Sequence, residues 1–476
     1  MGTNKNQKLE KVILIYTRPW FADFYEILAS KMEEVFGYRV VFFSDYEMKN
    51  TYNISPIKGD IVDTNVTVEN EYFDIIKRDR VLKDEPWEFA TQLLAAYQIR
   101  ISEFFERYAV QFVFSATIDQ FAIDLCYRHC LVKKIPFIGY HLSVIPEYTL
   151  LTSRGERSRF RDPNGEEISL AIESIAPKSF RPTYIPQKGR LKIAGLTRLF
   201  ANFVRVPYFF YRYTREKTYN YHFKSSYKIA ISRINLSPFM SLITPRLKLK
   251  SNERFDIYIP LQLHPECNSE YWGRDPEYQD YEDLIYSFCK RHSGSFKICV
   301  KEHPNMVGLR DTSLYKRFED LGVNIADVEE DNRLLIDRST VVVTYNSSVG
   351  IEGLLYGASI LCLGTPYYLT SGHISDEESM VRLILDYGSL PKEKPRTEDL
   401  RSSICQTLSM SIRGLLPDVE NIIDAGHKNK LEQKASYFTL ELKKYFNNIV
   451  MNDLTLKDVY TYSDIQNKKA ITRDSR

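Results

Sequence analysis

Two polar clusters in this chain, each at the end of an apolar run, contain the residues best suited to bind a phosphate group. His303 ends the strand-like run that begins at Lys297, and Pro304 prevents the strand from continuing. Ser347 and Ser348 follow a second β-branched run and precede a predicted helix. A hydroxyl-rich turn that opens a helix offers backbone N–H groups and the positive end of the helix dipole to an anion. Together the two clusters predict a site that holds a phosphate leaving group.

The histidine and the serines suit different parts of this chemistry. His303, between Lys301 and Pro304, could donate a proton or a hydrogen bond to a departing phosphate, although it could also only cap a loop. Ser347 and Ser348 could bind phosphate oxygens, and they could also cap the helix, since the two roles are compatible.

Five other residues near these runs are candidates for contacts with a nucleotide-sugar donor. Asn346 belongs to the same turn, and Gly350 would let the backbone approach a ligand closely. Glu352 could accept a hydrogen bond from a ribose hydroxyl, or it could be a solvated helix carboxylate. Gln262 and Glu266 lie just beyond the end of another predicted strand, where they could contact the donor sugar or base. We therefore assign all five to donor binding, together with Lys301, Pro304 and the two serines.

The N-terminal half contains the candidates for the acceptor side. Asp119 follows the predicted strand Phe112–Phe114 and is either a catalytic carboxylate or the N-cap of the next helix. Arg154 and Glu156 lie in a polar loop after an apolar strand; we assign Arg154 to a sugar contact and Glu156 to the catalytic candidates. Arg18 and Asp23 flank the exit of the first strand and are further candidates for acceptor contacts. The sequence does not rank these carboxylates, so an inverting and a retaining mechanism both remain open.

The predicted elements alternate between strand and helix, which indicates an α/β fold with parallel sheets covered on both faces. The first series of elements comprises Lys11–Tyr16, Phe21–Phe36, Tyr38–Phe43, Trp87–Tyr108, Phe112–Phe114, Gln120–Val132 and Pro136–Ile138. The second comprises Phe255–Ile259, Tyr281–Arg291, Phe296–Val300, Leu314–Leu321, a strand at Asn324, and the two strands around the serine turn. After Met380 we expect only helices and a polar tail.

These series predict two doubly wound, Rossmann-like domains that face a cleft, with a basic helical insertion or linker between them. The predicted boundaries are 1–186 for the acceptor-side domain, 187–250 for the basic segment, 251–400 for the nucleotide-sugar domain, and 401–476 for the C-terminal helices and tail. Ligands of such sheets bind at the carboxyl ends of the strands.

The segment from Lys188 to Lys250 differs sharply in charge from the rest of the chain. It contains 14 Lys and Arg and one acidic residue, Glu216, whereas the whole chain has a formal net charge of only +2. Aromatic residues alternate with these cations, a pattern typical of helices that lie on anionic membranes. A solvated linker with core-facing aromatics is the main alternative. Nucleic-acid binding is the weakest one, and we expect no nucleic-acid partner.

Composition places few limits on function. The chain has 476 residues, of which 43% are hydrophobic and 26% charged, and no apolar run approaches the length of a membrane-spanning helix. The N-terminus is polar, so we expect no secretory signal. The seven cysteines have no metal-like spacing, which suits reduced thiols in the cytoplasm. We expect a cytoplasmic protein, peripheral on the inner face of the membrane.

Three motifs carry a family resemblance. Pro260–Glu266, Val300–Pro304 and Asn346–Gly353 together resemble bacterial capsular polysaccharide glycosyltransferases, a group that includes transferases of 3-deoxy-manno-octulosonic acid (Kdo) and has the GT-B architecture. They are more distantly similar to GT-B sialyltransferases. The resemblance implies transfer of a sugar, for example Kdo from a CMP donor, to a lipid-linked or polysaccharide acceptor. It also implies that no metal cofactor is needed, and the sequence has no Asp-x-Asp element at a strand end.

Three other functions share part of this pattern. A teichoic-acid-type polyol-phosphate transferase uses similar His-Pro and Ser-Ser elements, but a second His-rich or Asp-rich acceptor element is not evident. A sugar-nucleotide 2-epimerase also has a GT-B architecture, yet it does not need a basic aromatic segment. A non-catalytic polysaccharide-binding or assembly factor is the non-enzyme alternative. A phosphate loop for ATP is absent from the sequence, so ATP hydrolysis is not expected.

Overall fold

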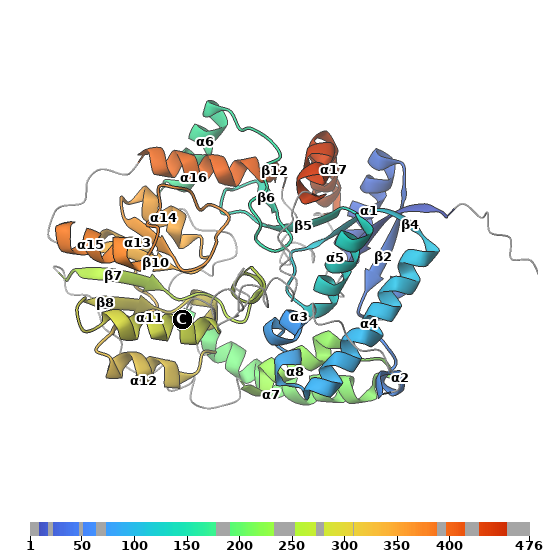
Figure 1. Cartoon of the computed structure of the whole chain (residues 1–476), viewed down its shortest axis with the longest axis horizontal. Helices are drawn as coiled ribbons and strands as arrows, with labels where there is room; N and C mark the ends of the chain where they lie inside the picture. Colours follow the sequence, from blue (N-terminus) through green and yellow to red (C-terminus); the bar gives the residue numbers. More distant parts are fainter. Residues whose placement is uncertain are drawn as a thin grey trace, which may run out of the picture.

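The computed structural model describes residues 9–17, 22–46, 51–62, 73–177, 191–232, 253–272, 280–307, 309–387, 397–414 and 428–454. Two α/β bodies lie side by side, each built around its own sheet, and the long helix α7 runs along one edge of both (Figure 1). The predicted α/β class with two Rossmann-like domains is confirmed by two largely parallel sheets.

The N-terminal sheet has seven strands in the order β12-β6-β5-β4-β1-β2-β3. These strands are β1 (Lys11–Tyr16), β2 (Arg39–Ser44), β3 (Thr51–Asn53), β4 (Ala109–Ala116), β5 (Phe137–Leu142), β6 (Tyr148–Leu151) and β12 (Ser411–Arg413). The five strands from β5 to β3 are mutually parallel, whereas β6 and β12 pair antiparallel at one edge.

Helices pack against both faces of this sheet, and alternating residues of each strand point toward opposite faces. In β1, Val12 and Leu14 pack with α4 and α5, whereas Ile13 and Ile15 pack with α1 and α17. A strand buried on both faces must be apolar at every position, which explains the uninterrupted run in β1. The helices of this body are α1 (Ala22–Phe36), α2 (Lys58–Val62), α3 (Phe73–Arg78), η3 (Leu82–Asp84), α4 (Trp87–Arg107), α5 (Phe121–Lys133), α6 (Gly165–Ile175) and α17 (Lys428–Leu454).

The C-terminal sheet has five parallel strands in the order β11-β10-β7-β8-β9. They are β7 (Phe255–Pro260), β8 (Ile298–Lys301), β9 (Asn324–Ala326), β10 (Ser339–Thr344) and β11 (Ser359–Cys362). One face packs with α11 (Tyr281–His292), α12 (Thr312–Asp320) and α15 (Glu377–Tyr387), and the other with α13 (Asn332–Asp337) and α14 (Val349–Leu355). The short helices α10 (Cys267–Glu270) and η4 (Pro304–Met306) follow β7 and β8.

The chain returns to the N-terminal body after the second sheet. The helix α16 (Thr397–Ser409) packs against α6 and α14, and it leads into β12, which pairs with β6. The expectation of helices alone after Met380 is therefore wrong, because Ser411–Arg413 forms a strand. Three residues are too few to show a period of two, and only the partner strand supplies the hydrogen bonds that define β12.

The basic segment is helical where it is described. It forms α7 (Leu191–Arg215) and α8 (Tyr221–Ser232), which pack against each other. The N–H group of Lys58 in α2 donates to the carbonyl of Lys217, and α7 also contacts η4 of the C-terminal body. The insertion therefore touches both domains. Among the described residues, none of the helices combines the length and apolarity that crossing a membrane requires.

Candidate active site between the two domains

The five parallel strands of the N-terminal sheet follow the same order along the chain as the five strands of the C-terminal sheet, and this order defines where a ligand can enter each of them. In the N-terminal sheet the direction of winding reverses between β1 and β4, and in the C-terminal sheet it reverses between β7 and β10. Open α/β sheets bind ligands in the crevice outside the carboxyl ends of the two strands at this reversal. Asp119 follows β4, and Glu266 follows β7. The predicted carboxylates on each side therefore lie at the expected crevice of their own domain.

The segment after β7 crosses from the C-terminal domain into the N-terminal one. The indole N–H of Trp272 donates to Thr117 Oγ1 over 2.9 Å, and the Tyr271 hydroxyl donates to Asp79 Oδ2 over 2.7 Å. Both aromatic side chains are about 1% exposed. Gly155 lies against the indole so closely that an added Cβ would come within 2.8 Å of it. The two crevices are thus held face to face by buried contacts.

Charged groups of both domains meet beside these contacts. Arg80 forms an ion pair with Glu270, whose side chain is fully buried, and donates to the backbone carbonyl of Asp119 over 3.2 Å. The same guanidinium and the Asp119 carboxylate both act electrostatically on Glu266. One arginine and three carboxylates from two domains therefore lie in one region, where Glu270 is fully buried and Asp119 and Glu266 are half-buried.

This environment changes the acidity of two glutamates. Burial raises the pKa of Glu266 to about 7; Arg80 and a hydrogen bond with Asn268 oppose the rise, and Asp119 adds to it. Burial also raises the pKa of Glu270 to about 7, against the opposing charge of Arg80. A carboxyl group with a pKa near neutrality can both accept and release a proton at physiological pH.

His303 lies at the end of β8, as its position in the sequence predicts. Its Nδ1 accepts a hydrogen bond from the Asn305 N–H over 3.1 Å, so the ring caps η4, which begins at Pro304. Because Nδ1 is the acceptor, the neutral ring carries its proton on Nε2. The cap and the proposed donor role are therefore compatible, since they use different ring nitrogens.

The residues beside His303 anchor the strand end. Lys301 is buried and its Nζ donates to Asn332 Oδ1 over 3.0 Å. Glu302 accepts from Arg310, with 2.7 Å between Nε and Oε2, and Arg310 also donates to the carbonyl of Gln262. Arg310 is about 1% exposed. This buried arginine joins the loops after β7 and β8 and so fixes the position of His303.

Gln262 and Asn346 connect the loops that follow β7 and β10, the two strands between which the winding reverses. The Oε1 atom of Gln262 accepts from the Asn346 N–H over 2.7 Å, and Asn346 Nδ2 donates to the Asn268 carbonyl over 2.7 Å. Both side chains are buried. In this structure the two residues therefore position the loops that carry Glu266 and the serines.

The turn before α14 is held by hydrogen bonds between its own polar groups. The N–H of Val349 donates to Ser347 Oγ over 3.3 Å, and the N–H groups of Gly350 and Ile351 donate to the carbonyls of Ser347 and Ser348. The ring of Tyr368 occupies the space that a side chain at position 350 would need. Gly350 thus permits close packing of Tyr368, and these three N–H groups already have partners within the turn.

Glu352 lies one turn into α14 and is partly exposed. Its charge contributes to raising the pKa values of Tyr258 and Tyr356, for which burial is the larger cause. Glu352 therefore lies on the side of the C-terminal sheet that α13 and α14 cover, where the Tyr258 hydroxyl donates to Asn332 at the start of α13.

The loop candidates of the N-terminal domain have different surroundings. Glu156 accepts backbone N–H groups of Ser153 and Arg154 with both carboxylate oxygens, each over 2.5 Å, so it shapes its own loop. Arg154 lies 3.5 Å from Asp124 and 3.9 Å from Asp74. Arg18 lies outside the described residues. Asp23 is in α1, but the position of its side chain is not described.

Several residues of this site were not singled out from the sequence. Arg80, Glu270 and Trp272 hold the domains together, and Arg310 anchors the strand ends. The only local signal was the polar content of the segment after β7, which contains Glu266 and Glu270.

A cavity of about 360 Å³ opens beside this site, between η3, α8 and the loops after β7 and β8. Its lining contains four cations, Arg80, Lys83, Lys228 and Arg310, and four carboxylates, Asp84, Asp280, Glu282 and Asp311. One oxygen of Asp280 lies 3.4 Å from His264 Nε2. Burial tends to raise the pKa of Asp280, but the hydrogen bond with His264 outweighs burial and lowers that pKa to about 2.

A search of solved structures finds proteins that are similar over most of the chain at low sequence identity. Two solved structures of KpsC from Thermosulfurimonas dismutans are similar. The β-Kdo 2,4-transferase is 12% identical, covers 85% of this chain and 92% of its own, and has a TM-score of 0.35. The β-Kdo 2,7-transferase is 16% identical, covers 73% and 96%, and has a TM-score of 0.28. The UDP co-structure of S. aureus MnaA is 8% identical, covers 93% and 98%, and has a TM-score of 0.29. Similarities this weak are not evidence of activity.

A comparison with curated protein sequences gives no match. The model of one family, described as capsule polysaccharide biosynthesis protein, matches residues 166–393. This region includes all three motifs on which the resemblance rests, those around Gln262, His303 and Ser347. The part of this chain that contains the three motifs, residues 166–393, is thus similar to the capsule polysaccharide biosynthesis protein family, the family that the motifs predict.

Proposed function

We propose that the protein is a glycosyltransferase of capsule polysaccharide biosynthesis that moves a sugar from a nucleotide donor to a glycan or lipid-linked acceptor. The observation that carries the proposal is the meeting of Asp119 and Glu266, from the crevices of two Rossmann-like domains, around Arg80. The family match supports the biological process, and the crevice of the C-terminal sheet supports a nucleotide-sugar donor.

In the proposed reaction the bond between the anomeric carbon and the donor phosphate oxygen breaks, and a bond to the acceptor hydroxyl oxygen forms. Glu266 takes the proton of that hydroxyl, a role that a pKa of about 7 favours. His303 donates a hydrogen bond from Nε2 to the leaving phosphate. The hydroxyls of Ser347 and Ser348 add contacts to its oxygens. Resident metal is not part of the proposal, in which His303 and the two serines contact the leaving phosphate.

The proposed location is the inner surface of the membrane, and α7 is the element that supports it. Its exposed side chains include Phe200, Val204, Tyr208 and Tyr211, which recur at helical spacing and lie on one face. Exposed arginines flank this face, and α7 contains no acidic residue. The same helix contacts η4, the short helix that His303 caps.

A panel of nucleotides tests the donor assignment by thermal shift. Binding to the folded state stabilises it by RT ln(1 + [L]/Kd), so a nucleotide that binds should raise the Tm. A rise in Tm that is selective for CMP is expected for an acidic-sugar donor. A rise selective for UDP would indicate a different class of donor sugar. His303→Ala should reduce turnover about 10²–10⁴-fold in a protein that still folds, with only the small fall in Tm that loss of the η4 cap causes. Normal turnover in this variant would contradict the role of His303, and the absence of any nucleotide effect would contradict the proposed function. Glu378→Gln, on the exposed surface of α15, is the matched control.

A further inference from the structure

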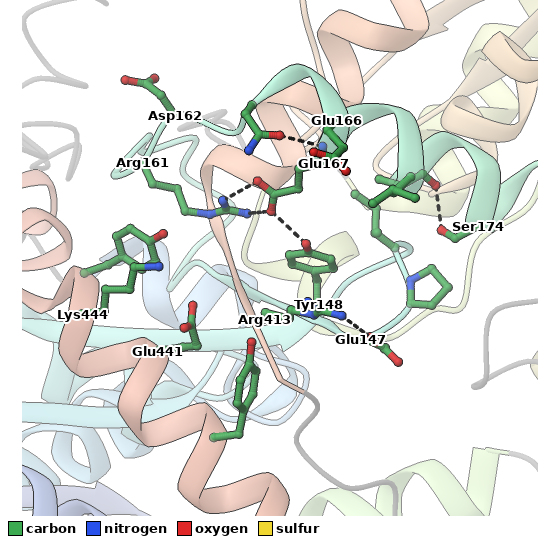
Figure 2. Close-up of a pocket in the computed structure, with 17 residues that line it drawn as sticks. Glu147, Tyr148, Arg161, Asp162, Glu166, Glu167, Ser174, Arg413, Glu441 and Lys444 are labelled. Atoms are coloured by element: carbon green, nitrogen blue, oxygen red, sulfur yellow. Dashed lines mark hydrogen bonds and ion pairs between the residues drawn. The ribbon is translucent and has the colours of Figure 1, made fainter.

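A second cavity, of about 730 Å³, lies at the opposite edge of the N-terminal sheet from β3. It is lined by the β5–β6 loop, β6, the start of α6, β12 and α17, and none of the residues discussed in the interdomain site line it. Figure 2 shows Arg161 and Glu167 on one side of this cavity, with Glu441 and Lys444 of α17 across from them. A site here would be independent of the proposed chemistry in the cleft.

The inner wall is a fixed array of polar groups. Arg161 binds Glu167 through two parallel hydrogen bonds of 2.9 and 2.6 Å, and its Nε donates to the Ser411 carbonyl over 2.8 Å. The Tyr148 hydroxyl donates to Glu167 Oε1 over 2.8 Å (Figure 2). A bidentate pair held at a third point keeps its planar groups in place before any ligand arrives.

Three tyrosines supply the other kind of surface that the cavity offers. The Arg161 guanidinium carbon lies 5.9 Å from the ring centre of Tyr148 and 5.8 Å from that of Tyr445. Tyr437 also lines the cavity and is 43% exposed, so its ring is accessible. Pyranose rings present C–H groups on their faces and hydroxyls around their rims. Tyrosine rings beside paired carboxylate and guanidinium groups complement both features.

The charges of the lining restrict the ligand. Five carboxylates line the cavity, against three cations, Arg161, Arg413 and Lys444; the carboxylates belong to Glu147, Asp162, Glu166, Glu167 and Glu441. This excess of negative charge disfavours a phosphate or a sugar acid. The volume falls within the range of about 300–1,000 Å³ that is usual for small-ligand pockets and exceeds what one monosaccharide needs.

We propose that this cavity is a second glycan-binding site, which takes an uncharged oligosaccharide and holds part of the acceptor away from the reacting end. The inference rests on the proposed function for the presence of a glycan, but its chemistry is read from the cavity alone. A second point of attachment would keep a growing chain near the cleft between transfers, because it raises the effective concentration of the acceptor.

The test measures binding of maltohexaose, cellohexaose, chitohexaose and the anionic hexagalacturonate to the full chain by saturation-transfer NMR and calorimetry. At least one neutral hexasaccharide should bind. Tyr437→Ala and Glu441→Gln, both on α17, should each weaken its binding at least about tenfold, as loss of an aromatic or charged contact does. Leu440→Ala, an exposed position on the same helix outside the cavity, should leave binding unchanged.

Failure of all neutral hexasaccharides to bind, or unchanged binding in both cavity variants, would overturn the proposal. Tighter binding of hexagalacturonate that depends on Tyr437 would overturn the assignment of an uncharged ligand. The nucleotide thermal shift, measured on the same samples, separates this result from the donor assignment. Glycan binding without nucleotide stabilisation would support the cavity and contradict the proposed donor, and the reverse pattern would overturn the cavity alone.

Discussion

At the scale of single residues, the acidity of Glu266 connects stability to the proposed chemistry. A glutamate in an unfolded chain has a pKa near 4.3, whereas burial raises that of Glu266 to about 7 in the folded protein. Between these values the folded state retains a proton that the unfolded state has lost. Its contribution therefore makes the protein less stable as pH rises from about 4.5 to about 7.

Glu266→Gln removes the titrating carboxyl group, so it should raise the stability of the protein at high pH while it lowers turnover. At pH 8 the variant should be more stable than the natural protein by roughly 1–3 kcal/mol, with little difference near pH 4, as measured by urea unfolding. Turnover should fall about 10²–10⁴-fold if Glu266 accepts the proton. A variant of unchanged stability at pH 8 would contradict the raised pKa, and full turnover would contradict the catalytic role.

Replacement of Asp119 provides an independent test of Glu266 as the proton acceptor, because the charge of Asp119 contributes to the raised pKa of Glu266. In Asp119→Asn, the acidic limb of the kcat/KM profile should move to lower pH, whatever the loss of activity on the plateau. The control Asp320→Asn, at an exposed position at the end of α12, should keep the limb in place.

At the scale of elements, α7 carries the membrane prediction. Co-sedimentation with vesicles should require anionic lipid and should weaken as salt shortens the Debye length from about 10 Å at 0.1 M to about 3 Å at 1 M. Replacing Phe200, Val204, Tyr208 and Tyr211 by Ser should abolish binding, because these side chains form the exposed apolar face.

The arginines of α7 are not equivalent in this test. Arg205 and Arg215 are exposed, whereas Arg212 binds Glu216 over 2.9 Å and the Tyr46 hydroxyl over 3.2 Å, so its loss would disturb the fold. Arg205→Gln with Arg215→Gln should weaken binding by about 1 kcal/mol per charge and reduce its salt dependence. Leu385→Ser, an exposed position on α15, is the control. A native protein that ignores anionic vesicles at low salt would leave α7 as a linker between the domains.

At the scale of the whole molecule, the segment containing Tyr271 and Trp272 couples the two domains. Trp272→Ala would empty a buried volume at the interface and remove the hydrogen bond to Thr117. The free energy of unfolding should fall by about 3–5 kcal/mol.

Calorimetry should then resolve two transitions, since each domain keeps its own core. Trp87→Ala, at a position 51% exposed, should change the unfolding free energy much less. A single transition with native stability in Trp272→Ala would show that other contacts couple the domains.

The sequence by itself determined the long strands and helices of both sheets and the polar residues that end them. The uninterrupted apolar runs of β1 and β7, and the histidine and serines that follow β8 and β10, depend on neighbours along the chain, so their patterns were legible without the structure. The α/β class and the position of His303 at a strand end followed from this local information.

Only the tertiary structure decided which of those residues meet. Arg80 and Glu270 are 190 residues apart, and the strand β12 exists because β6 lies beside it. Glu156, an isolated polar loop residue in the sequence, proved to be occupied by backbone N–H groups, whereas Asp119 and Glu266 were brought into one region. Desolvation and ion pairing depend on what packs around a group in space, and the spacing of residues along a chain does not contain that information.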